Sequence, residues 1–226
     1  MLPLPRTQTT AGYRTERRNA PAATVGSPLN PIELMGAQMP FSRDAEIFGE
    51  KEPAEYIYKV VSGAVRTYRI LADGRRQIQA FHLAGDVFGF EPGDEHTLSA
   101  EAIVESRVLV IKRTAVEALA ARDHQVARGL LALMARELQR VQRHVTLLVM
   151  TAQERVIDFL LEMTARDPEK ALTLPMSRQD IADYLGLTIE TVSRTFSSLE
   201  TAATIELPNS RRVVLRDREA LSRLAN

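Results

Sequence analysis

The chain has 226 residues, with 29 Lys and Arg against 29 Asp and Glu, and it contains no Cys. Without Cys it cannot form disulfides, thiolate zinc sites, Cys-ligated iron–sulfur clusters or a Cys nucleophile. No apolar run approaches the roughly 20 residues of a membrane span. Because 45 % hydrophobic and 26 % charged residues are typical of globular proteins, we expect a soluble cytoplasmic protein with no membrane partner.

The first 30 residues differ in composition from the rest of the chain. They contain Pro3, Pro5, Pro21 and Pro28 among Thr, Arg and Ala, and they show neither a helical nor a strand period. Such a segment cannot bury enough apolar surface to form a packed element. We therefore expect a mobile N-terminal arm over residues 1–30.

Short apolar runs separated by turn residues follow, as is typical of β-structure. The runs fall at residues 56–61, 64–71, 77–83, 102–104 and 108–111. Asp73-Gly74 lies between the second and third runs and is the strongest short-range signal for a β-hairpin. The pattern predicts a small antiparallel barrel or roll, which we place over residues 31–120.

A helical period begins after Thr114 and continues to about Arg166. Within residues 121–150 the apolar positions repeat every three and four residues, and we call these positions the seam: Ala127, Leu131, Met134, Leu138, Val141, Val145 and Leu148. This repeat favours a helix that pairs with a second copy of the chain, giving a homodimer. The alternative is a helix that packs only on its own roll, through Leu130, Leu133 and Leu147. Both can hold, on two faces of one helix.

The last 76 residues contain the signals of a helix-turn-helix. Thr151 and Glu154 fit a capping box that starts a new domain over residues 151–226. Ser177 and Asp180 fit a second one, and Gly186 supplies the left-handed turn between two helices. A separate hypothesis makes residue 177 a Cys in the natural chain, where oxidation would add negative charge beside DNA.

The second helix of this motif is expected to begin at an N-cap Thr188 and to bury one stripe. The stripe consists of Val192, Phe196 and Leu199. Downstream, the apolar runs 204–207 and 212–215 flank a polar turn that contains Arg211. These runs predict a β-hairpin wing with a basic tip.

Residues on the outer face of the second helix suit the major groove of DNA. Arg can donate two hydrogen bonds to guanine, and Glu can accept one from cytosine. We assign base reading to Ile189, Glu190, Ser193 and Arg194. We assign phosphate contacts to Arg178, Thr188, Thr191, Ser197, Arg211 and Arg212. The alternative is that Glu190 and Arg194 form an ordinary surface ion pair on a structural helix.

Three runs of sequence carry a family resemblance over about residues 40–220: 61–65 (VSGAV), 81–89 (FHLAGDVFG) and 177–194 (SRQDIADYLGLTIETVSR). The chain resembles the Crp/Fnr superfamily of bacterial transcription regulators, and within it the FixK-type activators. The resemblance implies an α+β fold with a cyclic-nucleotide-binding-like β-roll, a long dimerisation helix and a C-terminal winged helix-turn-helix.

The same resemblance implies a function. Members of this type activate genes of low-oxygen respiration and nitrogen fixation together with RNA polymerase. In Fnr-like members a Glu-x-x-Ser-Arg arrangement reads a TTGA-type half-site, and in this chain it falls on Glu190, Ser193 and Arg194. We therefore expect the homodimer to read double-stranded DNA at a palindrome resembling TTGA-N6-TCAA.

The sequence departs from the nucleotide-binding members of the family at two positions. Phe90 stands where those members have a ribose-binding Glu, and Leu98 stands where they have a phosphate-binding Arg. The cluster cysteines of oxygen-sensing members are also absent, and the four His show no metal-ligand spacing. We therefore expect no cofactor, no bound metal and no enzyme activity. The open alternatives are a regulator of this fold gated by a small ligand, a ligand-sensing signalling module, and an enzyme on a cupin-like barrel.

Overall fold

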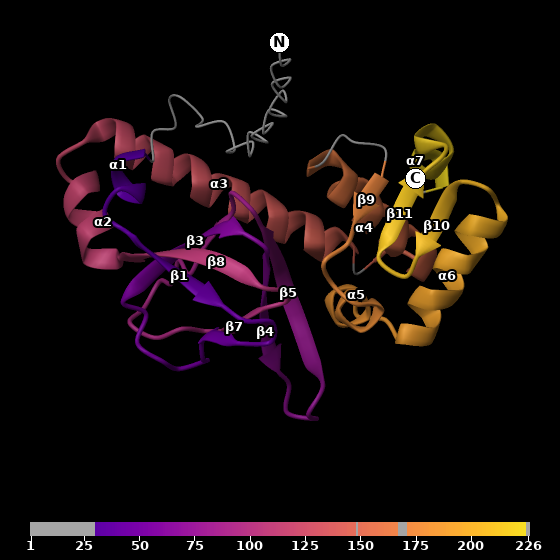
Figure 1. Cartoon of the computed structure of the whole chain (residues 1–226), viewed down its shortest axis with the longest axis horizontal. Helices are drawn as coiled ribbons and strands as arrows, with labels where there is room; N and C mark the ends of the chain where they lie inside the picture. The colour runs from indigo at the N-terminus through magenta and orange to yellow at the C-terminus, as the bar shows by residue number, and fades with distance from the viewer. Residues whose placement is uncertain (1–29, 148, 167–170, 225–226) are drawn as a thin grey trace, which may run out of the picture.

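The computed structural model of the chain describes residues 30–147, 149–166 and 171–224. Figure 1 shows a β-rich body and a mainly helical body, joined by one long helix that passes along the first. Residues 1–29 of the expected arm lie outside the described residues. Within the described ranges, no helix is both long and apolar enough to cross a membrane.

The β-rich body, which we call the roll, contains two four-stranded antiparallel sheets. Their orders are β1-β8-β3-β6 and β2-β7-β4-β5. The strands are β1 (Ala37–Phe41), β2 (Glu46–Phe48), β3 (Tyr56–Ser62), β4 (Ala64–Ile70), β5 (Arg76–Leu83), β6 (Val87–Phe88), β7 (Ser99–Ala102) and β8 (Ser106–Lys112). The apolar face of each sheet points inward, so the two sheets enclose a core of their own.

Four of the five predicted runs correspond to β3, β4, β5 and β8, and β4 pairs with β5 across the expected Asp73-Gly74 turn. The strand predicted at 102–104 is wrong, because β7 ends at Ala102 and the chain bends at Ile103, whose side chain is buried. Strands β1, β2 and β6 were not predicted. They are short, and β1 is mostly exposed, so they lack the inward alternation that marks a strand.

Gly63 shows why the turn between β3 and β4 needs glycine. Its φ of +88° lies in the left-handed region, and a Cβ there would come within 2.3 Å of Ser106 Oγ. That hydroxyl accepts a hydrogen bond from the amide of Ala64 at 3.1 Å. The close approach of the β3–β4 turn to β8 therefore depends on the missing side chain.

In the described part of the chain, four helices precede the helix-turn-helix: α1 (Asn30–Glu33), α2 (Arg113–Ala120), α3 (His124–Leu147) and α4 (Ala152–Arg166). The inner face of α3 packs on the roll through Val126, which is fully buried, and through the half-buried Leu130. The predicted capping box opens α4, because Thr151 Oγ1 accepts from the amide of Glu154 and Glu154 accepts from the amide of Thr151. The predicted helical region is therefore confirmed, with breaks between helices.

The C-terminal body, which we call the reader domain, spans α4 to the end of the described chain. It adds β9 (Ala171–Thr173), α5 (Arg178–Leu185), α6 (Ile189–Thr201), β10 (Ile205–Asn209), β11 (Arg212–Leu215) and α7 (Arg218–Leu224). The sheet order is β10-β11-β9, so the predicted wing has a third strand. Strand β9 and helix α7 were not predicted, since three and seven residues are too short to show a period.

One hydrophobic core extends from the roll into the reader domain. The ring of Phe81 on β5 lies 5.2 Å from the ring of Tyr184 on α5 and 6.2 Å from that of Phe159 on α4. Ala64, Ile78 and these rings belong to the same buried cluster. The two bodies are therefore packed together, in addition to being connected by the chain.

Candidate DNA-binding site

The helix pair α5–α6 has the capping that the sequence predicts. Ser177 accepts a hydrogen bond from the amide of Asp180 at 3.1 Å, and Asp180 accepts from the amide of Ser177 at 2.9 Å. Gly186 ends α5 with a φ of +64°, and the fully buried Ala182 lies on the inner face of the helix. These features fix the turn between the two helices.

Helix α6 begins at its N-cap Thr188, whose side chain accepts from the amide of Thr191 at 3.2 Å. The expected inner stripe is buried, at Val192, Phe196 and Leu199. The four proposed base readers, which we call the reader face, are exposed on the opposite side: Ile189, Glu190, Ser193 and Arg194. In Figure 1, α6 runs along the outer edge of the reader domain, and its first turn lines a cleft together with the β4–β5 hairpin of the roll. The structure therefore brings these residues together on one accessible surface.

The negative charge of the reader face lies on Glu190, in the first turn of α6. The pKa of Glu190 is lowered, because its carboxylate interacts with its own backbone amide, with the Thr188 hydroxyl and with the charge of Arg194. A deprotonated Glu is the form that accepts a hydrogen bond from a cytosine amino group. The side chain of Arg194 is exposed, so its guanidinium is accessible to a DNA base.

The residues assigned to phosphate contacts on α5 and α6 differ in their exposure to solvent. Thr188 and Ser197 are exposed and Thr191 is half-buried. The guanidinium of Arg178 stacks 3.3 Å from the centre of the Phe196 ring, and burial lowers its pKa to about 10. A cation over an aromatic ring is a packing interaction, so the structure gives Arg178 a role inside the helix pair as well.

The wing turn is held by the side chain of Asn209, which accepts from the amides of Arg211 and Arg212 at 2.9 and 2.8 Å. Arg211 Nη1 donates to the carbonyl of Pro175 at 2.7 Å, in the segment before α5. Arg212 is exposed. Arg212 is thus the wing residue with the more accessible charge.

The seam lies on the outer face of α3. Five of its members are between 49 and 66 % exposed: Leu131, Met134, Leu138, Val141 and Val145. Ala127 is half-buried, and Leu148 lies outside the described residues. Leu130 and Leu133 face the roll, and Leu147 is buried. One helix therefore packs on its own roll and also presents a continuous apolar stripe, which indicates an interaction surface.

The roll has apolar side chains at the two positions that mark the nucleotide-binding members of the family. Its interior is filled by stacked rings, with Phe48 3.6 Å from His96 and Phe88 4.7 Å from His82 between ring centres. Phe90 and Leu98 are half-buried and carry no charge that could compensate a phosphate. These two positions therefore offer no polar partner for the ribose or the phosphate of cAMP.

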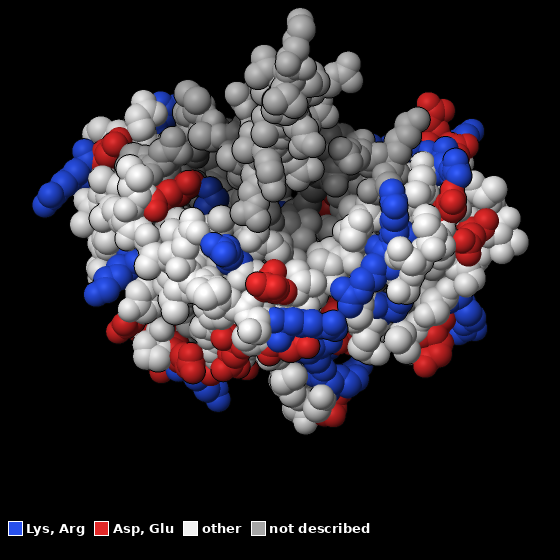
Figure 2. Space-filling view, viewed as in Figure 1, with Lys and Arg blue, Asp and Glu red and all other residues white. Residues whose placement is uncertain are grey.

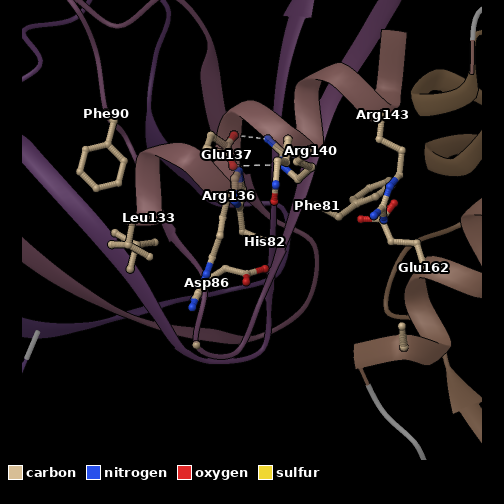
Figure 3. Close-up of a pocket in the computed structure, with 14 residues that line it drawn as sticks. Phe81, His82, Asp86, Phe90, Leu133, Arg136, Glu137, Arg140, Arg143 and Glu162 are labelled. Atoms are coloured by element: carbon tan, nitrogen blue, oxygen red, sulfur yellow. Dashed lines mark hydrogen bonds and ion pairs between the residues drawn. The ribbon is translucent and has the colours of Figure 1, made fainter. Parts of the chain in front are cut away.

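A cleft of about 340 Å³ lies between the roll and helices α3 and α4. Figure 3 shows Phe90 and Leu133 at one end and Arg143 with Glu162 at the other. Between them, Arg140 forms an ion pair with Glu137. Three arginines and three acidic residues line the cleft, so its formal charges balance: Arg136, Arg140, Arg143, Asp86, Glu137 and Glu162. No group of three metal-ligating side chains occurs within the residues that the structure describes.

One group of residues around the helix pair is not predictable from the sequence. Arg66 and Arg76 of the roll form ion pairs with Asp180 of α5, and Arg76 also pairs with Asp183. These residues lie about a hundred positions apart in the chain, so no local pattern connects them. Asp180 was interpreted only as part of a capping box.

The fold and this surface define a helix-turn-helix transcription regulator with a cyclic-nucleotide-binding type of roll. Residues 154–224 match the Crp-like helix-turn-helix domain, and residues 38–123 match the cyclic nucleotide-binding domain. The nitrogen fixation regulation protein FixK of Azorhizobium caulinodans is 50 % identical over 214 residues, which cover 92 % of this chain and 86 % of that protein. The FixK of Rhizobium meliloti is 41 % identical, covering 88 % and 92 %.

Among solved structures, FixK2 from Bradyrhizobium japonicum is similar to this chain with a TM-score of 0.82 and 51 % identity, covering 84 % of this chain and 98 % of that one. The chain belongs to the Crp/Fnr family, whose members are transcription regulators and not enzymes. The expected fold class is confirmed, with its antiparallel sheets, long helix and helix-turn-helix.

Proposed function

We propose that this protein is a homodimeric activator that reads a palindrome resembling TTGA-N6-TCAA and controls genes of low-oxygen respiration and nitrogen fixation. The observation that carries the proposal is the reader face, which holds Glu190, Ser193 and Arg194 exposed on one side of a capped helix. The names of the FixK relatives support the biological role. A regulator of this kind acts in the bacterial cytoplasm and contacts RNA polymerase.

The exposed seam supports a homodimer. A two-fold pair of α3 helices would cover the apolar stripe and present two copies of α6 to one side of a DNA duplex. Half-sites in a palindrome are then read one helical turn apart, because the symmetry of the site mirrors that of the protein. Arg212 and the phosphate-assigned residues of α5 and α6 would fix the register on the backbone.

The DNA site is tested by selecting bound sequences from random duplex DNA with the purified full-length chain. The proposal expects enrichment of two inverted TTGA-like half-sites separated by six base pairs. Enrichment of a single half-site would contradict the dimer, and recovery of unrelated sequences would contradict the assignment of the reader face.

We further propose that DNA binding needs neither cAMP nor a metal. Millimolar cAMP or cGMP should leave the melting temperature within about 1 °C, since a ligand raises stability only when it binds the folded state. Affinity for the selected DNA should likewise be unchanged by nucleotide or by EDTA. Because a shift of several degrees would mean saturable binding, it would favour the alternative of a regulator gated by a small ligand, with the cleft beside Phe90 as its site.

A further inference from the structure

Charged side chains from the roll reach the helix-turn-helix at one buried junction. Asp180 Oδ1 accepts hydrogen bonds from Arg66 Nη1 at 3.0 Å and from Arg76 Nη2 at 2.7 Å. Asp183 accepts from Arg76 Nε at 2.9 Å. We call these four residues the roll–reader ion pairs. Figure 2 shows basic and acidic side chains meeting where the lower part of the roll adjoins the reader domain.

These groups are withdrawn from water to different degrees. The side chains of Asp180 and Arg66 are only 5 and 8 % exposed, whereas that of Arg76 is 24 % exposed. Arg66 also pairs with Glu101 at 2.8 Å within the roll. This contact orients the guanidinium of Arg66 independently of the reader domain. Buried, hydrogen-bonded charges tolerate little change in geometry, because a small displacement leaves a desolvated charge without its partner.

The junction joins the two bodies through the first helix of the motif, while the second helix is separated from the roll by an open cleft at its first turn. Asp180 and Asp183 lie on α5, and Gln77 Nε2 of β5 also donates to the carbonyl of Tyr184 at 3.4 Å. The reader face on α6 remains exposed in this arrangement. The contact therefore constrains where α6 points without covering the surface that would meet DNA.

We infer that Arg66 and Arg76 are positioning residues for DNA recognition, which hold α5, and through it α6, in the orientation that lets both readers of a dimer fit one site. The inference rests on the proposed function. A dimer binds two half-sites together only if each α6 keeps a fixed angle to the seam helix, and the joint between α3 and α4 is a single connection. The roll–reader ion pairs add directional contacts to the non-directional packing of Phe81 against Phe159 and Tyr184.

The first variant to test is Asp183→Asn. The inference predicts weaker DNA binding for it, whereas the loss of a negative charge alone predicts tighter binding. Removing a negative charge near the DNA should tighten binding if charge alone mattered. If the carboxylate holds the orientation of α5, the affinity for the selected palindrome should instead fall by about tenfold, the size typical of coupled charged pairs. An Asp183→Asn protein that bound the palindrome as well as or better than the parent would overturn the inference.

Arg76→Gln should weaken binding by a similar factor, and Arg76→Lys by less, because an ammonium can still reach one carboxylate. The double variant Arg76→Gln with Asp183→Asn should be no weaker than Arg76→Gln alone, since the two residues act through one contact. The matched control is Arg75→Gln. Arg75 is the adjacent arginine and is exposed, and among the described residues its ion pair is with Asp73 in the turn. It lines the same cleft beside α6 and so matches Arg76 in charge and location, but its loss breaks no ion pair to α5 and should change affinity by less than about twofold.

A second measurement does not involve DNA. Because the protein has no Cys, spin labels can be attached to the double variant Glu105→Cys, on the roll, with Glu219→Cys, on α7. Both positions are exposed. Labelled chains are diluted with unlabelled ones so that only distances within one chain are measured. The distance between the labels should be narrowly distributed in the parent and broader in Arg76→Gln, with unchanged circular dichroism. Equal distributions would overturn the inference even if the protein binds DNA. Failure of the parent to select any DNA would refute only the proposed function.

Discussion

A Leu138→Glu variant should be monomeric and should lose binding to the palindrome. Leu138 lies in the middle of the seam and is 58 % exposed in the single chain, as expected of a residue covered by a partner. In a two-fold pair, the substitution would place two carboxylates opposite each other in an apolar contact, at a cost of several kcal/mol. A single reader rarely holds one half-site at physiological salt.

Sedimentation velocity and operator binding measure the two consequences of Leu138→Glu separately. The matched control is Ala132→Glu, which introduces the same charge at an exposed position of α3 outside the seam and should leave the dimer intact. A Leu138→Glu protein that still sedimented as a dimer would remove α3 as the pairing helix, whatever its affinity for DNA.

An Arg194→Ala variant should lose both affinity and selectivity at one base pair of each half-site. A bidentate contact between Arg and guanine contributes roughly 1 to 3 kcal/mol of discrimination, and a dimer makes it twice. In a series of duplexes substituted at each position, the preference for guanine should flatten and the other positions should keep theirs. Uniform weakening across the series would show that Arg194 contacts phosphate and that α6 is not the reading helix.

The contrasting variant for Arg194 is Arg212→Ala at the wing. Loss of the Arg212 side chain should weaken binding to all sequences alike. It should also reduce the slope of log affinity against log salt by about 0.9 per subunit, because the variant neutralises one phosphate fewer and so releases fewer counterions from the DNA. Arg211→Ala is a less clean test, because its guanidinium also holds the carbonyl of Pro175. Loss of stability could then be confused with loss of a DNA contact.

The parts of the structure that depend on local pattern were predictable. Capping boxes at Thr151 and Ser177, the left-handed Gly186 and the buried stripe of α6 all follow from residues within four positions of each other. The two faces of α3 follow from its periods. Helical periodicity also predicts that the base-reading residues share one exposed face of α6, as they do. Their contacts with DNA stay predictions.

The parts that depend on distant residues were not predictable. Nothing near Asp180 indicates that Arg66, 114 positions earlier, will donate to it. The stacking of Arg178 on Phe196 likewise depends on how two helices cross, which a single sequence does not specify. Strand β9 is defined as a strand by its antiparallel pairing with β11, because three residues are too few to show a period in the sequence.

The core shared by Phe81, Phe159 and Tyr184 bears on how such a protein can be recombined. A roll from one relative and a reader domain from another would meet with unmatched rings and unmatched charges, even if each part were intact. Exchange at the boundary near residue 151 would therefore give poorly packed hybrids, unless β4, β5, α4 and α5 were taken from the same parent. The unit that must be inherited together is this set of elements, and the point where the chain crosses between the bodies is not a natural site for a swap.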